Sequence, residues 1–235
     1  MKIIGAGLSK TGTSSLGTAL EQLGFSCLHY DQHRLNDVLE GRDPNPDFRR
    51  YDDVDAVLDV PAAFFFRELL EAYPSAKVIL TVRNIDAWWI SIREHFNERL
   101  PITWPTWKDK LRARLNRSED DLSEWLENAR FRSNHRSVVY GSPDAREFLF
   151  KKKFRDHNSA VQHEVPADRL LIMDITAGDG WNTLCPFLGV PIPGAPFPHE
   201  NKGYDRGRDK TAQRATALAP GGSMTNAVAP PTSRA

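Results

Sequence analysis

The 235-residue sequence has only two cysteines, no net charge and no long apolar run. Cys27 and Cys185 stand far apart and in no paired motif, so we expect two free thiols in a reducing compartment. A stretch of roughly 20 apolar residues, which a membrane-spanning helix needs, is missing, and the N-terminus has no signal-peptide pattern. The sequence therefore predicts a cytoplasmic protein without a membrane partner.

The balance of charge also limits the kinds of partner that the protein is expected to bind. The 31 basic residues offset the 31 acidic ones, which argues against broad binding to nucleic acid or to an anionic membrane and still permits a local basic pocket. The length suits one domain with a tail, by the rough prior of about 150 residues per domain. After Lys202 the hydrophobic residues vanish and Ala, Pro and Gly dominate. We therefore expect one domain over residues 1–202 and a disordered tail over residues 203–235.

A phosphate-binding loop is the strongest signal in the chain. Residues 3–16 read as a short strand, a loop rich in glycine and hydroxyl residues, and the start of a helix. Glycine permits backbone angles and a close approach that a Cβ forbids, so amide groups and the helix dipole converge on one anion. Gly7 and Gly12 occupy the two glycine positions of the P-loop pattern, but Thr13 follows where a nucleoside triphosphatase has lysine. The lysine lies inside the loop, at Lys10, which indicates a ligand with one 5′-phosphate and a short leaving bond.

Strands and helices alternate along the rest of the domain. Apolar, β-branched runs predict strands at residues 25–30, 56–58, 76–82 and 170–174. Apolar residues at helical spacing predict helices at residues 16–23, 62–73, 85–96, 111–130, 144–161 and 184–188. We therefore expect an α/β fold, a three-layer sandwich with a central, mostly parallel sheet of the P-loop NTPase-like type.

Two polar residues directly follow predicted strands, at the edge where open α/β sheets bind ligands, and a third lies on the next helix. Asp59 comes after the strand at 56–58, and capping of the following helix is the alternative role for its carboxylate. Arg83 comes after the strand at 76–82, with a surface ion pair to Asp86 as its alternative. Ser91 lies about 120° from the centre of the apolar stripe of the next helix, where it faces either a pocket or solvent.

Histidine and tryptophan residues raise two further questions. His29 and His33 stand four residues apart, but no third ligand occurs at a recognisable spacing, so we predict no metal site. Trp104 and Trp107 lie between prolines in a polar, irregular stretch. They either line an acceptor pocket, form a lid or pack into the core.

Together these motifs resemble those of the sulfotransferases that depend on 3′-phosphoadenylyl sulfate (PAPS). The loop at residues 10–15 is similar to the 5′-phosphosulfate loop of that family, and residues 78–84 with Ser91 are similar to its 3′-phosphate motif. Residues 58–61 resemble the segment that carries a catalytic histidine in many cytosolic members, with Asp59 at the position of the histidine. Residues 180–201 are similar to the end of a branch of mostly uncharacterised sulfotransferase-like proteins. Lys202-Gly203 is similar to a lysine–glycine pair that touches the 3′-phosphate in cytosolic members.

The resemblance implies a P-loop-type fold and transfer of a sulfuryl group from PAPS to a hydroxyl or amine of a small-molecule acceptor. It implies two catalytic residues. Lys10 would stabilise the leaving oxygen, so that no metal is needed, and Asp59 would take the acceptor proton if its pocket raises the pKa of the carboxyl toward neutrality. The residues implied to bind the donor are Lys10, Thr11, Gly12, Thr13, Ser14, Ser15, Arg83 and Ser91.

Two other functions remain open from the sequence. A small-molecule kinase of the P-loop class is expected to need magnesium and a lysine after Gly12, where this chain has Thr13. A non-catalytic nucleotide-binding scaffold is the second alternative, and the presence of Lys10 and Asp59 argues against it. The sequence identifies neither the acceptor nor the oligomeric state, and a homodimer is among the options.

Overall fold

The computed structural model describes residues 2–116 and 119–200 of the chain. The predicted disordered tail, residues 203–235, and the Lys202-Gly203 pair lie outside the described residues. The domain boundary at residue 202 therefore stays a prediction. Within the described ranges, no helix is both long enough and apolar enough to cross a membrane.

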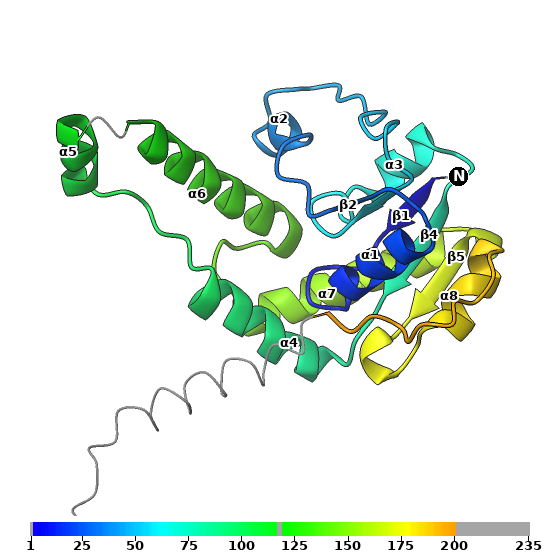
Figure 1. The fold of residues 1–235 in the computed structure, drawn as a ribbon. Helices are drawn as coiled ribbons and strands as arrows, with labels where there is room; N and C mark the ends of the chain where they lie inside the picture. Colours follow the sequence, from blue (N-terminus) through cyan, green and yellow to red (C-terminus); the bar gives the residue numbers. More distant parts are fainter. Residues whose placement is uncertain (1, 117–118, 201–235) are drawn as a thin grey trace, which may run out of the picture. The chain divides into compact units, whose positions relative to one another are not determined.

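A parallel sheet, five-stranded within the described residues, forms the centre of the fold (Figure 1). Its strands are β1 (Ile3–Gly5), β2 (Cys27–His29), β3 (Ala56–Leu58), β4 (Lys77–Thr81) and β5 (Leu170–Met173). The strand order is β2-β3-β1-β4-β5, and each neighbouring pair is parallel. β1 lies in the middle, with Ile4 opposite Val57 of β3 and Val78 of β4. The carboxyl ends of the strands therefore meet at one edge, where such sheets bind ligands.

Helices cover both faces of the sheet. They are α1 (Thr13–Gln22), α2 (Asn36–Leu39), α3 (Phe66–Ala72), α4 (Ile85–Arg93), the π-helix η1 (Glu94–Arg99), α5 (Trp107–Asn116), α6 (Glu119–Tyr140), α7 (Glu147–Glu164) and α8 (Trp181–Leu188), with short 3₁₀ turns η2 (Ala167–Arg169) and η3 (Ile175–Ala177).

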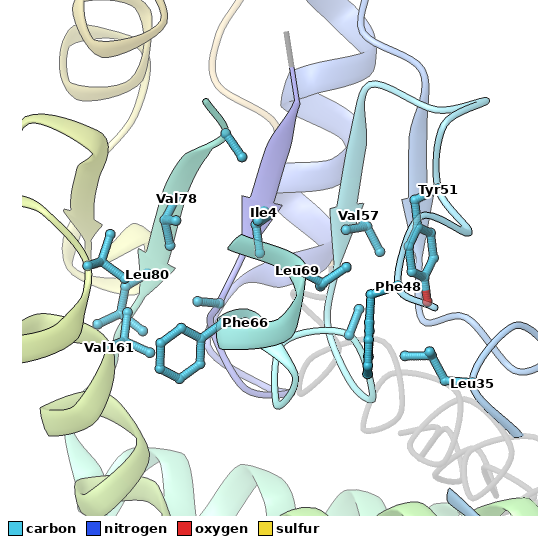
Figure 2. Close-up of a cluster of buried hydrophobic side chains, with 14 residues drawn as sticks. Ile4, Leu35, Phe48, Tyr51, Val57, Phe66, Leu69, Val78, Leu80 and Val161 are labelled. Carbon is cyan, nitrogen blue, oxygen red and sulfur yellow. The ribbon is translucent and has the colours of Figure 1, made fainter. Parts of the chain in front are cut away.

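Successive strand residues point to opposite faces, so each face of the sheet has its own core. Ile4 packs with Phe66 of α3 and with other side chains of α3 and α7 (Figure 2). Ile3 packs on the other face with Leu20 of α1 and Leu184 of α8. The sheet and its two layers of helices form the three-layer sandwich that the sequence predicts, and the predicted α/β fold is confirmed.

The helix after β3 begins later than predicted. We expected it at residues 62–73, but α3 begins at Phe66 and residues 60–65 form turns. Phe65 precedes the helix, and no side chain among the described residues caps it. Capping of α3 is therefore not the role of Asp59.

The predicted helix at residues 111–130 is wrong in its bounds, because two helices, α5 and α6, occupy this region. α5 begins earlier because Thr106 and Asp109 cap one another. The amide of Thr106 donates to Asp109 Oδ2 at 2.9 Å, and the amide of Asp109 donates to Thr106 Oγ1 at 3.4 Å. α6 continues past residue 130 because Phe131, His135 and Val139 follow at helical spacing and are all buried.

Candidate active site

The phosphate-binding loop joins β1 to α1 at the middle of the sheet (Figure 1). Gly12 precedes α1 with a φ of 102°, an angle that favours glycine, and Lys10 has a φ of 71°. Gly7 is required for a different reason, since a Cβ there would lie 1.8 Å from Thr81 Oγ1 on β4. Among the described residues no side chain caps the first turn of α1. Its first amide groups and the helix dipole are therefore available to an anion.

Cationic side chains gather at this loop. Lys10 is half-buried, and burial lowers the pKa of its ammonium group. The charges of Arg99 and Arg83 lower that pKa further, while the carboxylates of Asp59 and Glu94 raise it. Positive charge concentrated in this way stabilises negative charge on a bound oxygen.

Arg83 lies beside the loop. Its Nη1 donates to the backbone oxygen of Lys10 at 3.1 Å, so the structure brings this predicted donor-binding residue to the loop. Nε of Arg83 is buried without a hydrogen-bond partner among the described residues, and burial lowers the pKa of the guanidinium. The alternative ion pair with Asp86 is wrong, because Asp86 instead binds Lys151 at 2.7 Å. A bound anion would supply the acceptor that the buried Nε lacks.

Two hydroxyl groups of the loop already have protein partners. Thr11 Oγ1 donates to the backbone oxygen of Leu8 at 2.7 Å and lies 2.6 Å from Thr81 Oγ1. Ser15 Oγ accepts from the backbone amide of Glu200 at 3.0 Å. These bonds fasten the loop to β4 and to residues far along the chain. We therefore expect the backbone amides at these two positions, rather than the hydroxyls, to serve an anion.

The remaining predicted donor-binding serines are both half-buried. Ser14 lies in the first turn of α1, directly at the loop. Ser91 lies on α4, eight residues after Arg83, and forms no hydrogen bond with Arg83 or with the loop in the described part of the chain. The structure thus groups Arg83 with the loop, and the role of Ser91 stays a prediction.

Asp59 is buried next to the loop and has a φ of 67°, in the left-handed region. Its Oδ1 accepts from Ser9 Oγ at 2.5 Å and from the amide of Val60 at 2.6 Å. Its Oδ2 accepts from Thr13 Oγ1 at 2.9 Å and lies 3.3 Å from His29 Nε2. Burial raises the pKa of Asp59, but the bonds from His29, Ser9 and Val60 outweigh burial and place the pKa below its ordinary value. The condition for Asp59 to act as the base, a raised pKa, is therefore not met, because the pocket is rich in donors to the charged form.

His29 is the residue of this site that sequence reasoning missed. It ends β2, which pairs with β3 so that His29 lies opposite Leu58, one residue before Asp59. Its Nε2 lies 3.1 Å from Thr13 Oγ1, and its side chain is 31% exposed against 7% for Asp59. The sequence did contain a signal for this contact, because His29 and Asp59 both stand at the carboxyl ends of predicted strands. The sequence did not show that these two strands are neighbours.

Neutral, mostly aromatic side chains lie near Asp59. Tyr30 packs edge-on against Phe131 and His135, with ring centroids 5.7 and 5.8 Å apart. Burial lowers the pKa of His135 and of His95 to about 4, so both imidazoles are neutral at pH 7. The charge of Asp59 acts on the pKa of Tyr30 and of both histidines, which places them around the carboxylate. The charge of Arg136 acts on the pKa of all three groups as well, so this surrounding is aromatic but carries positive charge besides the carboxylate.

One of these histidines has an unused acceptor. His135 Nδ1 lies 2.9 Å from the backbone oxygen of Phe131, which can only accept, so Nδ1 carries the hydrogen. Its Nε2 therefore bears a lone pair, and this atom is buried without a partner among the described residues. A hydroxyl or amine donor would satisfy it.

The tryptophans and the histidine pair that the sequence singled out have different outcomes. Trp104 and Trp107 are 51% and 70% exposed, so packing into the core is wrong for both, and a role in a pocket wall or lid stays a prediction. His33 is exposed, whereas His29 binds Thr13 and Asp59. Within the described residues no group of three His, Cys, Asp or Glu side chains could hold a metal ion.

Comparison with known proteins points to one family. A family model described as "Sulfotransferase domain" matches residues 2–205, a range that contains the loop, Asp59 and Arg83. A curated relative, "Ava biosynthesis cluster protein M" of Aspergillus versicolor, is 30% identical over 223 residues, which cover 85% of this chain and 80% of the relative.

Proposed function

The chain belongs to the sulfotransferase domain family, and on this premise we propose that it transfers a sulfuryl group from PAPS to a hydroxyl or amine of a small-molecule acceptor. The observation that best supports this proposal is the 3.1 Å hydrogen bond from Arg83 Nη1 to the backbone oxygen of Lys10. It joins an anion-binding loop to an arginine whose Nε has no partner among the described residues. PAPS carries anionic groups at both the 5′ and the 3′ position, which suits two anion-binding elements in one site.

The donor would be held at its two ends. The loop amides at residues 11–15 and the ammonium group of Lys10 suit the 5′-phosphosulfate, because they combine a helix N-terminus with a positive charge. The guanidinium of Arg83 suits the 3′-phosphate, with Ser91 as a further proposed contact. The 3′-phosphate distinguishes PAPS from ordinary nucleotides, so Arg83 would set the preference for this donor.

Transfer would be an in-line displacement at sulfur. The acceptor oxygen or nitrogen forms a bond to sulfur, while the bond between sulfur and the bridging oxygen of the 5′-phosphate breaks and leaves its electron pair on that oxygen. Lys10 would stabilise the charge that develops there. A sulfuryl group carries less charge than a phosphoryl group, so a lysine would replace the magnesium of kinases and no metal would be needed.

Asp59 would take part in removing the acceptor proton, and the geometry supports a role through His29. The carboxylate of Asp59 is nearly fully buried and already engaged, and its lowered pKa makes it a weak base. The hydroxyl of Thr13 donates to Asp59 Oδ2, so both groups next to His29 Nε2 offer it lone pairs. Nε2 would therefore carry the hydrogen, and Nδ1 would accept the proton of the acceptor. The carboxylate of Asp59 would stabilise the imidazolium that forms.

The acceptor is proposed to be a small molecule with an apolar or aromatic body. The aromatic side chains near Asp59, among them Tyr30 with its ring contacts to Phe131 and His135, support this class. The unpartnered Nε2 of His135 would bind a hydroxyl or amine of such a molecule. The name of the relative, a biosynthesis cluster protein, also supports a small-molecule acceptor.

Calorimetric titration with adenosine 3′,5′-bisphosphate tests the donor site. We expect binding that is the same with magnesium and with EDTA. Adenosine 5′-monophosphate should bind at least about tenfold more weakly, because a charge-assisted hydrogen bond to a phosphate contributes roughly 1.5–3 kcal/mol. Binding that needs magnesium, or that favours ATP, would identify a kinase-like site instead.

A second experiment tests the reaction. The protein is incubated with PAPS and a cell extract, and mass spectrometry follows products that are heavier by one sulfuryl group. We expect such products with the wild type, and with Lys10→Ala they should form about 10²-fold or more slowly. Tight binding of adenosine 3′,5′-bisphosphate without any product would indicate a non-catalytic nucleotide-binding protein.

A further inference from the structure

Three residues other than glycine, among those that the structure describes, have a left-handed backbone. They are Lys10, Tyr30 and Asp59, with φ angles of 71°, 58° and 67°. For a bulky residue such as tyrosine this conformation is an outlier, and strained residues of this kind gather at functional sites. Tyr30 directly follows His29 at the end of β2, so its side chain belongs to the same edge of the sheet as the proposed proton acceptor.

A chain of ring contacts runs from Tyr30 to a buried arginine. The ring of Tyr30 packs edge-on against His135 of α6, with centroids 5.8 Å apart, and His135 packs against Phe96 of η1 at 6.3 Å. The guanidinium carbon of Arg136 lies 4.0 Å from the centroid of the Phe96 ring. One end of this aromatic chain is therefore next to His29, and the other end is positively charged.

The charge of Arg136 has no counter-ion among the described residues. The residue is 1% exposed, and burial lowers the pKa of its guanidinium to about 10, which leaves the group charged at pH 7. It forms no ion pair in the described part of the chain, and its Nε is buried there without a hydrogen-bond partner. Buried charges in proteins are normally paired, because the desolvation of an isolated charge is costly.

Backbone oxygens hold part of this guanidinium. Nη2 of Arg136 donates to the oxygen of Leu100 at 2.7 Å, and Nη1 donates to those of Phe96 and Pro143 at 3.4 Å each. These bonds fasten η1 to the end of α6, which is a structural role for the side chain. They bring no full negative charge, however, and they leave Nε unused.

The titratable groups around Arg136 do not supply the missing charge. Burial raises the pKa of Tyr30 to about 12 and also raises that of Tyr140, so both phenols are neutral at pH 7. His135 is neutral at this pH as well, since burial lowers its pKa to about 4. The carboxylate of Asp144 also acts on Arg136, but it is exposed and forms no ion pair with the guanidinium.

Arg132 adds a second positive charge on the same side of α6, one turn before Arg136. It forms no ion pair within the described ranges. The charges of both arginines act on the pKa of Tyr30 and of His135. Arg132 and Tyr30 are half-buried, so solvent reaches this end of the ring chain through them.

We propose that the acceptor of the sulfuryl group is an aromatic hydroxyl compound that also bears a carboxylate, and that Arg136 binds this carboxylate. The inference rests on the proposed function and narrows its acceptor. The aromatic ring would lie along Tyr30 and His135, with its hydroxyl toward His29. Nε of Arg136 would donate to a carboxylate oxygen and so gain the partner that it lacks, and Arg132 would add attraction.

Calorimetry with the full-length protein tests this inference without turnover. With adenosine 3′,5′-bisphosphate at saturation, the protein is titrated with 4-hydroxybenzoate, 3-(4-hydroxyphenyl)propanoate and 4-hydroxycinnamate, and with the methyl ester of each. Acid and ester share the ring and the hydroxyl and differ in charge. At least one acid should bind at least about tenfold more tightly than its ester, because hydrogen bonds between charged groups are the stronger ones. If no acid binds more tightly than its ester, the inference is overturned.

Variants of α6 test where the carboxylate binds. Arg136→Met keeps a long side chain without the charge and should bind acid and ester equally, while thermal unfolding shows whether the variant is folded. Arg132→Gln should reduce the preference for the acid by about threefold or more. Arg130→Gln is the matched control, because Arg130 is exposed on the opposite side of the helix from Arg132, and it should keep the wild-type preference.

The comparison of acid and ester in the wild type and in Arg132→Gln decides the matter if Arg136→Met does not fold. A preference for the acids that is unchanged in every folded variant of Arg132 and Arg136 would overturn the inference.

Mass spectrometry of incubations with PAPS separates this inference from the proposed function. Acids that bind through Arg136 but yield no sulfated product, in incubations where the cell extract yields none either, would support the carboxylate site and contradict sulfuryl transfer. Faster sulfation of the esters than of the acids would support the transfer and overturn the carboxylate site.

Discussion

His29 Nε2 and Asp59 Oδ2 lie 3.3 Å apart, at the carboxyl ends of two neighbouring parallel strands. The two side chains differ in access, since that of His29 is partly exposed and that of Asp59 is almost fully buried. Thr13 in the first turn of α1 contacts both of them. The pair therefore connects the phosphate-binding loop to the region of aromatic side chains near Asp59, which is where a proton would leave the acceptor in the proposed reaction.

Replacement of His29 should remove the proton acceptor. We expect His29→Ala to lower kcat by about 10²-fold or more while the affinity for adenosine 3′,5′-bisphosphate stays unchanged. Added imidazole should restore part of the lost rate, which it would not do if His29 only supported the fold. His33→Ala is the control, because His33 is exposed four residues further on and should keep the wild-type rate. An unchanged kcat in His29→Ala would exclude His29 from proton transfer.

Replacement of Asp59 should reveal the pH dependence of its contribution to stability. The folded-state pKa of Asp59 is lowered, so the folded protein binds fewer protons than the unfolded chain, and acid favours unfolding. At neutral pH Asp59→Asn should be less stable by about 1–3 kcal/mol, since the donors around the carboxylate lose their charged acceptor. This difference should shrink as the pH falls below about 4, the ordinary value for aspartate.

Denaturant unfolding of both proteins at several pH values measures that difference. The same variant should lose turnover by about 10²-fold or more at neutral pH, with donor binding retained. If the stability gap between wild type and Asp59→Asn were independent of pH down to acid, the lowered pKa of Asp59 would be refuted.

Arg83 should control recognition of the 3′-phosphate. Arg83→Ala should weaken the binding of adenosine 3′,5′-bisphosphate by about tenfold or more. The binding of adenosine 5′-monophosphate should stay nearly unchanged, because only the first ligand has a 3′-phosphate. Arg83→Lys should recover only part of the loss, since lysine lacks the forked geometry of the guanidinium. Calorimetry with the two nucleotides measures both effects. An equal loss of affinity for the two nucleotides would show that Arg83 acts elsewhere in the site.

Lys10 should act mainly on the reaction rather than on binding. Lys10→Ala should lower kcat by about 10²-fold or more, because it removes the positive charge proposed for the leaving oxygen. The affinity for adenosine 3′,5′-bisphosphate should fall less than in Arg83→Ala. Steady-state kinetics with a product found by mass spectrometry, together with calorimetry, separate the two effects. A variant that binds poorly but turns over normally at saturation would contradict this role.

Gly7 should be intolerant of any side chain. A Cβ at Gly7 would lie 1.8 Å from Thr81 Oγ1 and 2.9 Å from the backbone nitrogen of Thr81, so the loop or β4 must shift. We expect Gly7→Ala to lower the free energy of unfolding by about 1–3 kcal/mol. Gly194→Ala is the control, because nothing lies within 4 Å of a Cβ at that exposed position. Thermal unfolding of both variants makes the comparison, and equal stability would contradict the close approach.

The sequence by itself determined the local parts of this protein. The loop with Gly7, Lys10 and Gly12 is specified by neighbours in the chain, since tight turns and helix starts depend on backbone angles that particular residues permit. The apolar strands and the alternation with helices likewise predicted the α/β sandwich, because a strand covered on both faces must be apolar throughout. Asp59 and Arg83 were found because each directly follows such a strand.

Only the tertiary structure decided which of these parts are neighbours. The strand order places β2 beside β3, and this pairing brings His29 to Asp59. It also helps to lower the pKa of Asp59, whereas a role as the base requires a raised one, because a carboxylate titrates according to the donors that reach it through space. The exposure of Trp107, Leu111 and Leu115 on α5 likewise became known only once the packed side of the helix was known. Spacing along the chain fixes turns and helices, whereas contacts between distant segments depend on the packing of the whole fold.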